Sequence, residues 1–180
     1  KKENVISGIA SDIKKVYGSK GFTLQAKGQG AITYTSNAPK VVTVGNTDGK
    51  VSIKGCGKAV ITVTAAGNSE YKPATKTVTV TVTPKKATLN SVKSTARKTI
   101  TVKWKRDAKA DGYQIQYSTS KKFKCAKTVD IKKKRTTITK TKKNLKAGKK
   151  YYVRVSAYKK NGKSKICGNY SKVKYVKVKK

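Results

Sequence analysis

The sequence predicts an all-β protein of two tandem β-sandwiches, and three observations lead to this prediction. Apolar and polar residues alternate in short runs along the 180 residues, which is the pattern of strands with one buried face. No window keeps the i, i+3, i+4, i+7 spacing of an amphipathic helix. Turn signals rich in Gly, Asn and Ser separate the runs at short intervals, as is typical of sandwiches.

The first half contains five candidate strands. In the clearest of them Val78, Val80 and Val82 alternate with threonines, so the valines are expected to face the core. Turn signals such as Asp48-Gly49 separate the candidates. The predicted strands are 22–26, 31–35, 51–53, 59–63 and 77–82.

The second half repeats this alternation with larger side chains. Three one-sided strands are predicted at 100–104, 113–117 and 151–157. A final edge strand is predicted at 173–178, with a bulge where the apolar face shifts between Tyr175 and Val176. Two interpretations stay open for four tyrosines: partial packing under lysine stems, which is favoured, and outward positions or sheet ends that suit a binding surface. These are Tyr34, Tyr152, Tyr158 and Tyr170.

Charge divides the chain unevenly. We place a domain boundary after Pro84, because proline interrupts strand pairing, and expect domains at 1–84 and 85–180. The first carries 12 basic and 4 acidic side chains, a net +8, and the second 33 and 3, a net +30. The second domain is therefore the one expected to contact an anionic partner.

Composition excludes most catalytic chemistry. The chain has no histidine, which removes imidazole bases, Ser-His-Asp and Cys-His pairs and His-containing zinc sites. Its seven carboxylates are scattered and its glycines fall singly at turns, so neither a carboxylate pair nor a phosphate loop is indicated. We predict a non-enzyme with no catalytic residues, cofactor or metal. No run approaches the ~18 apolar residues of a membrane span, so membrane insertion is not expected.

Four motifs occur in order in the first half: YTSN at 34–37, VVTV at 41–44, DGKV at 48–51 and GKAVITV at 57–63. This set resembles the bacterial immunoglobulin-like domain of group 2, over residues 7–84. The resemblance implies an immunoglobulin-like β-sandwich. Family members often have Trp where Tyr34 stands, a difference that changes the volume of the core.

The second half contains Trp104, GYQIQYS at 112–118 and LKAGKKYYVRVSAY at 145–158. This set resembles a fibronectin type III domain, which implies a second immunoglobulin-like sandwich and a tyrosine corner formed by Leu145 and Tyr151. No Arg-Gly-Asp sequence is present, so integrin binding is not implied. The residues expected to have structural roles are Trp104, Tyr113, Leu145 and Tyr151.

Such tandems resemble pieces of secreted or wall-attached proteins of Gram-positive bacteria. The chain begins without Met or a signal-peptide region, so we expect a fragment of a longer, extracellular protein. Three functions stay open: a spacer and adhesion segment, a dedicated binder of a host protein such as mucin, a matrix protein or immunoglobulin, and a nucleic-acid or other polyanion binder. Nucleic acid is the least favoured partner, because no RNA- or DNA-binding motif occurs.

Lysines of the second half are the candidate binding residues. In a fibronectin-like topology successive connections alternate ends, so lysines after the third strand and before the sixth are expected at one end. Only four of the 45 cations are Arg, and Lys acts as a point charge. We therefore expect salt-sensitive, weakly selective contact with an anionic glycan, wall polymer or host glycoprotein. The candidates are Lys121, Lys122, Lys142, Lys143, Lys146, Lys149 and Lys150.

Three cysteines are present, an odd number. Cys56 belongs to the first half, whereas Cys125 and Cys167 are expected near opposite ends of the second sandwich. A disulfide needs Cα atoms within ~7 Å, so we expect no bridge between Cys125 and Cys167.

Overall fold

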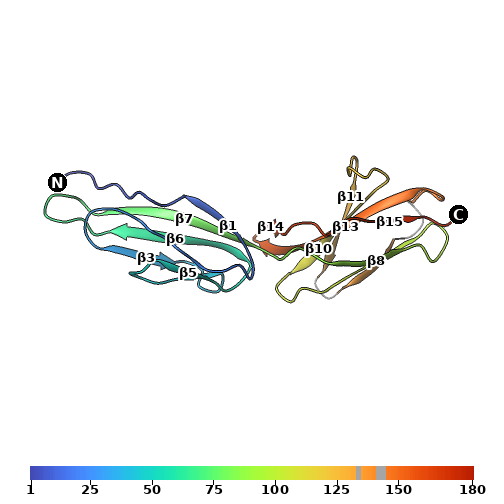
Figure 1. Ribbon diagram of the computed structural model, residues 1–180, viewed down its shortest axis with the longest axis horizontal. Coiled ribbons are helices and arrows are strands. Elements are labelled where there is room, and N and C mark those ends of the chain that lie inside the picture. Colours follow the sequence, from blue (N-terminus) through green and yellow to red (C-terminus); the bar gives the residue numbers. More distant parts are fainter. Residues whose placement is uncertain (133–134, 141–144) are drawn as a thin grey trace. The chain divides into compact units, whose positions relative to one another are not determined.

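The structure is a computed structural model that describes residues 1–132, 135–140 and 145–180. The chain divides into two compact units, Lys1–Thr83 (unit 1) and Pro84–Lys180 (unit 2). The described residues form strands and turns without a helix (Figure 1). The prediction of an all-β fold is confirmed.

Unit 1 is a sandwich of two sheets. Its strands are β1 (Asp12–Val16), β2 (Phe22–Thr23), β3 (Ile32–Ser36), β4 (Val42–Val44), β5 (Lys50–Ile53), β6 (Gly57–Ala65) and β7 (Ala74–Thr83). One sheet has the order β1-β7-β6-β3, and the other has the order β2-β5-β4. β1 runs parallel to β7, while the other pairs are antiparallel.

The core of unit 1 follows from alternation on β6 and β7. Val78, Val80 and Val82 are fully buried, as the sequence predicted, and Val78 pairs across the strands with Ile61. Val42 of β4 packs into the same core from the other sheet. The apolar faces of the two sheets therefore close on each other, which fixes the sandwich.

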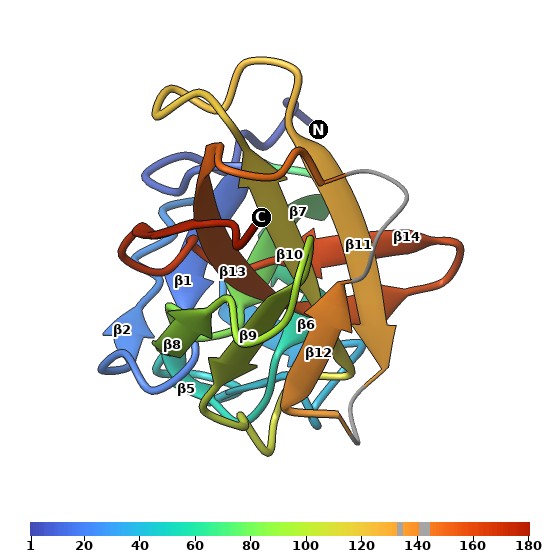
Figure 2. The same ribbon diagram turned by 90° about the vertical axis from the view of Figure 1, so that its right-hand side faces the viewer.

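Unit 2 is also a two-sheet sandwich. Its strands are β8 (Leu89–Lys93), β9 (Ile100–Trp104), β10 (Gly112–Ser118), β11 (Lys127–Lys132), β12 (Thr137–Lys140), β13 (Lys150–Asn161), β14 (Ser164–Cys167) and β15 (Lys174–Lys177). One sheet has the order β11-β10-β13-β14, with β15 beside β13, and the other has the order β12-β9-β8 (Figure 2).

Aromatic side chains fill the core of unit 2. Trp104 is 2% exposed and its ring centroid lies 5.5 Å from that of Tyr113. The Trp104 indole N–H has no hydrogen-bond partner in the described part of the chain, so this residue acts through packing. Leu145 and Tyr151, the two residues of the predicted tyrosine corner, are both buried. The Tyr151 hydroxyl accepts a hydrogen bond from the Lys146 amide at 3.0 Å.

Two of the four tyrosines with two open interpretations are fully packed, Tyr34 and Tyr158. Tyr34 lies inside unit 1, where its hydroxyl donates to the Leu24 carbonyl at 3.1 Å. Tyr158 lies on the outward face of β13 but is 5% exposed, because its ring covers Gly112 on β10 and Lys165 Nζ lies over the ring. Because Gly112 has no side chain, the ring of Tyr158 on the neighbouring strand packs over it and is buried.

The strand predictions need corrections, and the strands β1, β4, β8, β11, β12 and β14 lie outside the ranges predicted from the sequence. The run at 22–26 forms a strand only at Phe22–Thr23, and the Leu24 amide beyond it donates to the carbonyl of Gly49, the residue before β5. β1 was not predicted, because its sequence Asp-Ile-Lys-Lys-Val does not alternate apolar and polar residues; Ile13 is half-buried and Val16 is exposed. The bulge between Tyr175 and Val176 is wrong, since both residues keep an unbroken register with β13.

The irregularity of the last strand lies further upstream. Tyr158 pairs with Cys167 and Val153 pairs with Lys174, so seven steps along the last strand match five steps along β13. Ser171 bridges this offset, because its hydroxyl accepts from the Val155 amide at 3.0 Å. The strand is therefore divided into β14 and β15, and Tyr175 points outward.

Candidate anion-binding surfaces

Four segments of unit 2 meet at what we call the C-terminal pole: turns 94–99, 119–126 and 145–149, and the tail 178–180. Pairing of Ser118 with Tyr152 places the β10–β11 turn beside the start of β13. The Lys98 amide donates to the Lys179 carbonyl at 3.0 Å, and the Gly148 amide donates to the Val178 carbonyl at 2.8 Å. Backbone hydrogen bonds therefore hold the tail between two of the turns (Figure 2).

Four of the seven candidate lysines lie at this pole: Lys121 and Lys122 are in the β10–β11 turn, and Lys146 and Lys149 precede β13. Lys150, the first residue of β13, lies directly beside the pole, and all five of these lysines are exposed. Lys142 and Lys143 lie outside the described residues. The structure adds cations at this pole that the sequence analysis missed. Antiparallel pairing of the last strand with β13 would have predicted that the C-terminal tail lies at the same end as the start of β13. The added exposed cations are Arg97, Lys98, Lys124, Lys179 and Lys180.

A hollow of about 260 Å³ lies at the C-terminal pole. Three lysines line it: Lys124 precedes β11, Lys127 is the first residue of β11, and Lys146 precedes β13. Burial raises the pKa of Tyr117, which also lines the hollow and lies beside Tyr151. Tyr117 therefore stays uncharged at neutral pH, and no phenolate offsets the ammonium groups.

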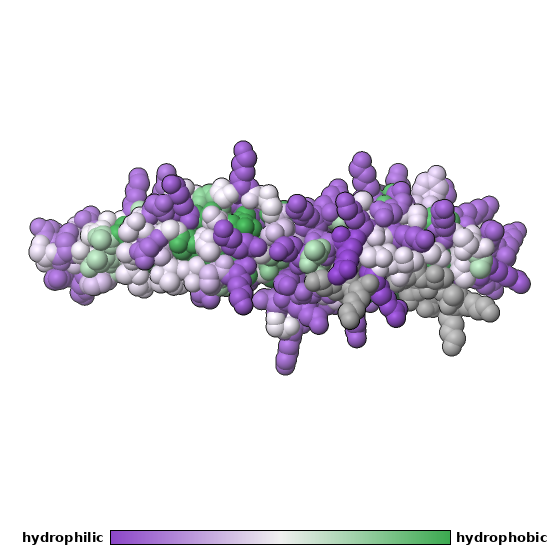
Figure 3. Space-filling model, turned by 90° about the horizontal axis from the view of Figure 1, so that it is seen from below, coloured by the Kyte–Doolittle hydropathy of each residue, from purple (hydrophilic) through white to green (hydrophobic). Residues whose placement is uncertain are grey.

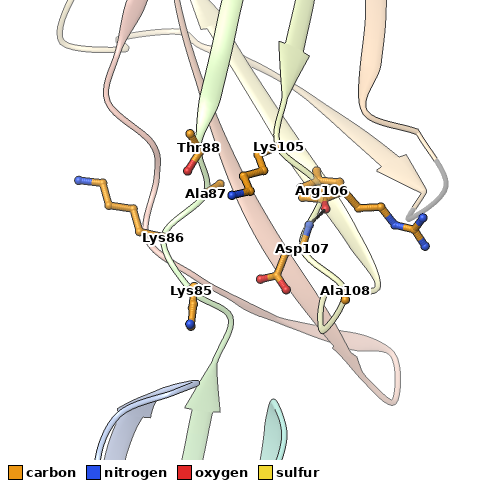
Figure 4. Close-up of a pocket in the computed structure, with 9 residues that line it drawn as sticks. Lys85, Lys86, Ala87, Thr88, Lys105, Arg106, Asp107 and Ala108 are labelled. Carbon is orange, nitrogen blue, oxygen red and sulfur yellow. Dashed lines mark hydrogen bonds between the residues drawn. The ribbon is translucent and has the colours of Figure 1, made fainter.

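The opposite end of unit 2, the N-terminal pole, comprises segments 84–88, 105–111 and 159–163. A hollow of about 270 Å³ here is lined by Lys85, Lys86, Lys105 and Arg106, with Asp107 among them. Lys86 and Arg106 extend in opposite directions (Figure 4). The cations therefore do not converge on one point, and Asp107 offsets part of their charge.

A second hollow at the N-terminal pole contains two ion pairs. Asp111 pairs with Lys159 at 2.9 Å, and Asp130 pairs with Lys165 at 2.6 Å. The hydrogen bond from Lys165, followed by that from Gln114, lowers the pKa of Asp130. The hollow, of about 610 Å³, is lined by Asp111, Asp130, Lys132, Arg135, Tyr158, Lys160 and Lys165.

Replacing Asp130 by asparagine is expected to lower the free energy of unfolding near neutral pH by less than about 1 kcal/mol, because the pair is largely exposed. A carboxyl with a lowered folded-state pKa stabilises the fold above its unfolded-state pKa, and this contribution is lost as the pH falls through the folded-state pKa. Chemical denaturation of wild type and Asp130→Asn across the acidic range checks this. A stability difference that persists after the carboxyl is protonated would contradict it.

Cys56, Cys125 and Cys167 form no disulfide with one another. Cys56 is buried in unit 1, while Cys125 and Cys167 are exposed. Cys125 lies in the β10–β11 turn, whereas Cys167 ends β14 opposite Tyr158. Burial raises the pKa of Cys167, so its thiol stays protonated at neutral pH.

The described ranges contain neither a metal cluster nor a membrane span. No group of three or more Cys, Asp and Glu side chains in these ranges lies close enough to hold a metal ion. In the same ranges, no helix is long and apolar enough to cross a membrane. The surface chemistry that remains is cationic, and hydrophilic side chains cover most of the visible face of unit 2 (Figure 3).

Comparison with known families assigns both units. A family model described as the intimin immunoglobulin-like domain matches residues 19–67, and the fibronectin type III model matches residues 82–167. Residues 19–67 thus match an intimin-type bacterial immunoglobulin-like domain, and residues 82–167 match a fibronectin type III domain. The predicted resemblance to a bacterial immunoglobulin-like domain followed by a fibronectin type III domain is confirmed. The family model that matches the first domain describes the intimin type. Domains of these families are typically non-catalytic adhesion or spacer modules of extracellular or surface proteins.

Two solved structures are similar to parts of this chain. The crystal structure of the chicken CNTN1 FN1-FN3 domains is 21% identical, with a TM-score of 0.48, over 84% of this chain and 57% of that chain. The solution structure of the fn3 domain of human contactin 1 is 24% identical, with a TM-score of 0.45, over 54% of this chain and 80% of that chain. The chain thus spans 57% of the length of the chicken chain. A comparison with curated proteins gave no match.

Proposed function

We propose that the chain is a spacer and adhesion segment of a secreted or wall-attached protein of a Gram-positive bacterium. Its fibronectin type III domain would contact an anionic polymer, such as a sulfated or sialylated host glycoprotein or a wall polymer. The contact surface would be the C-terminal pole.

One observation carries this proposal: the acidic and basic side chains of the domain are distributed differently. Its three carboxylates are Asp107, Asp111 and Asp130, of which the first two lie at the N-terminal pole and the third is on β11. No Asp or Glu occurs in 112–129 or 131–180. Cations from four connected segments therefore gather at the C-terminal pole without an acidic side chain, and a bound polyanion would relieve their repulsion.

Charge reversal in the full chain tests the location. Replacing Lys121, Lys122, Lys146 and Lys149 by Glu is expected to lower the affinity for heparin, a sulfated polysaccharide, at least about tenfold. Each lysine near an anionic surface contributes about 1 kcal/mol, and about 1.4 kcal/mol corresponds to tenfold. Titration calorimetry at fixed low salt gives the dissociation constants.

The matched control reverses four exposed lysines of the N-terminal pole. Replacing Lys85, Lys86, Lys105 and Lys160 by Glu changes the net charge by the same amount, and it is expected to lower the affinity only about two- to threefold through the general field. Equal losses from the two sets would show that only net charge matters. A larger loss from the control set would place the contact at the hollow shown in Figure 4.

A further inference from the structure

The outward face of β13 and β15 presents aromatic rings that the core does not use. Tyr152 and Tyr175 are direct cross-strand partners, with ring centroids 6.1 Å apart and planes inclined by 54°. Tyr175 is 63% exposed, and it is the one aromatic side chain of the described residues that belongs to the exposed class. Val173, on the same face, is 44% exposed. This apolar surface is therefore open to solvent.

Cations stand directly beside these rings. Lys150 Nζ lies 4.6 Å from the centroid of Tyr175. Lys150 and Lys177 are cross-strand partners, and like charges directly opposite each other on a sheet are destabilising. A ligand anion between the two ammonium groups would remove this cost. The edge of the sheet is thus charge-complementary to an anionic ligand.

Arg154, the next outward-pointing residue of β13 after Tyr152, lies on the same face of the sheet. Its guanidinium lies 4.1 Å from the ring centroids of both Phe123 and Tyr170. Its Nε donates to Gln116 Oε1 at 2.9 Å. Two rings and a hydrogen bond therefore fix the guanidinium, and a fixed planar fork suits carboxylate or sulfate better than a mobile ammonium does.

The aromatic ring faces that stay open to a ligand limit the kind of polymer that can bind here. Arg154 occupies faces of Phe123 and Tyr170, and Lys150 lies over Tyr175. Single-stranded nucleic acid stacks successive bases on several open aromatic faces, which this surface does not offer. One exposed ring flanked by cations suits one pyranose ring that carries a negative group.

We propose that Tyr175, with Tyr152, is a platform for a pyranose ring of an anionic polysaccharide, whose sulfate or carboxylate groups pair with Lys150, Lys177 and Arg154. This inference rests on the proposed function and deepens it, because it names a sugar-binding face beside the C-terminal pole. Charge would supply the attraction to any polyanion, and the ring would supply the preference for a sugar.

Two polyanions separate these contributions in the full chain: heparin, and long-chain polyphosphate, which has no sugar ring. Tyr175→Ala is expected to lower the affinity for heparin about tenfold, by analogy with base–aromatic stacking, and to change the affinity for polyphosphate less than twofold. Tyr175→Phe keeps the ring and is expected to bind heparin like wild type. Because Tyr175 is mostly exposed, thermal unfolding of both variants is expected to match that of wild type.

Each result has a distinct meaning. Loss of heparin affinity in Tyr175→Ala with rescue in Tyr175→Phe supports the platform. An unchanged heparin affinity in Tyr175→Ala, or an equal loss for both polymers, overturns the platform while the proposed function stands. If wild type binds neither polymer at low salt, the proposed function itself is wrong, and the platform fails with it.

Discussion

Replacing Trp104 by alanine is expected to cost the fibronectin type III domain about 3–5 kcal/mol of its free energy of unfolding, as for other buried tryptophans. The side chain is buried and packs against Tyr113, so its removal leaves a cavity in the centre of the core. A domain of this size is stable by about 5–15 kcal/mol. The variant is therefore expected to be marginally folded in this domain.

Two further variants make this result specific. Trp104→Phe is expected to cost less, because it fills most of the volume and the indole N–H has no partner to lose in the described part of the chain. Ile61→Ala is expected to destabilise the immunoglobulin-like domain instead, since Ile61 is buried in its core. Differential scanning calorimetry resolves the two domains. A Trp104→Ala variant with an unchanged thermogram would contradict the assigned core.

The affinity for heparin is expected to fall about a hundredfold when NaCl is raised from 50 to 200 mM. Polyanion binding releases condensed counterions, and the logarithm of the affinity falls in proportion to the number of contacts, here taken as about four to five. The contacts are exposed lysines, whose attraction is screened over ~10 Å at 0.1 M salt. Salt therefore acts on nearly all of the binding free energy.

Titrations of the full chain at several salt concentrations measure the slope. The variant with Glu at Lys121, Lys122, Lys146 and Lys149 is expected to have a much shallower slope, because it lacks most of the contacts. The variant of the N-terminal pole is expected to keep nearly the wild-type slope. Binding that is insensitive to salt would indicate a protein partner on a less charged strand edge or turn.

The sequence predicted what alternation alone determines. Val78, Val80 and Val82 on β7, and Trp104 and Tyr113 in unit 2, are buried where the pattern placed them. Contacts between strands that are far apart in the sequence could not be predicted from alternation alone. The alternation predicts that Tyr158 points outward, and its burial depends on Gly112 opposite it and on Lys165 over its ring.

The residues of the candidate anion-binding surface were likewise predicted only in part. The alternation of connections between ends predicted that the turn of Lys121 and the start of β13 share a pole, and the register of β10 with β13 places them together. Arg97 and the tail lysines were missed, because their position depends on hydrogen bonds between residues far apart in sequence. The aromatic face was missed because the predicted bulge keeps Tyr175 on the apolar face with Val176, whereas the unbroken register with β13 places Tyr175 on the opposite face.

The parallel pairing of β1 with β7 has a mechanical consequence. β1 lies near the start of the immunoglobulin-like domain and β7 ends it, and the two strands are in register from Asp12 with Thr79 to Val16 with Thr83. A force that pulls the two ends of this domain apart slides these strands along each other, so it loads their hydrogen bonds together in shear instead of opening them one by one. A segment that carries tension between a surface and a bound ligand would thus resist extension at its first domain.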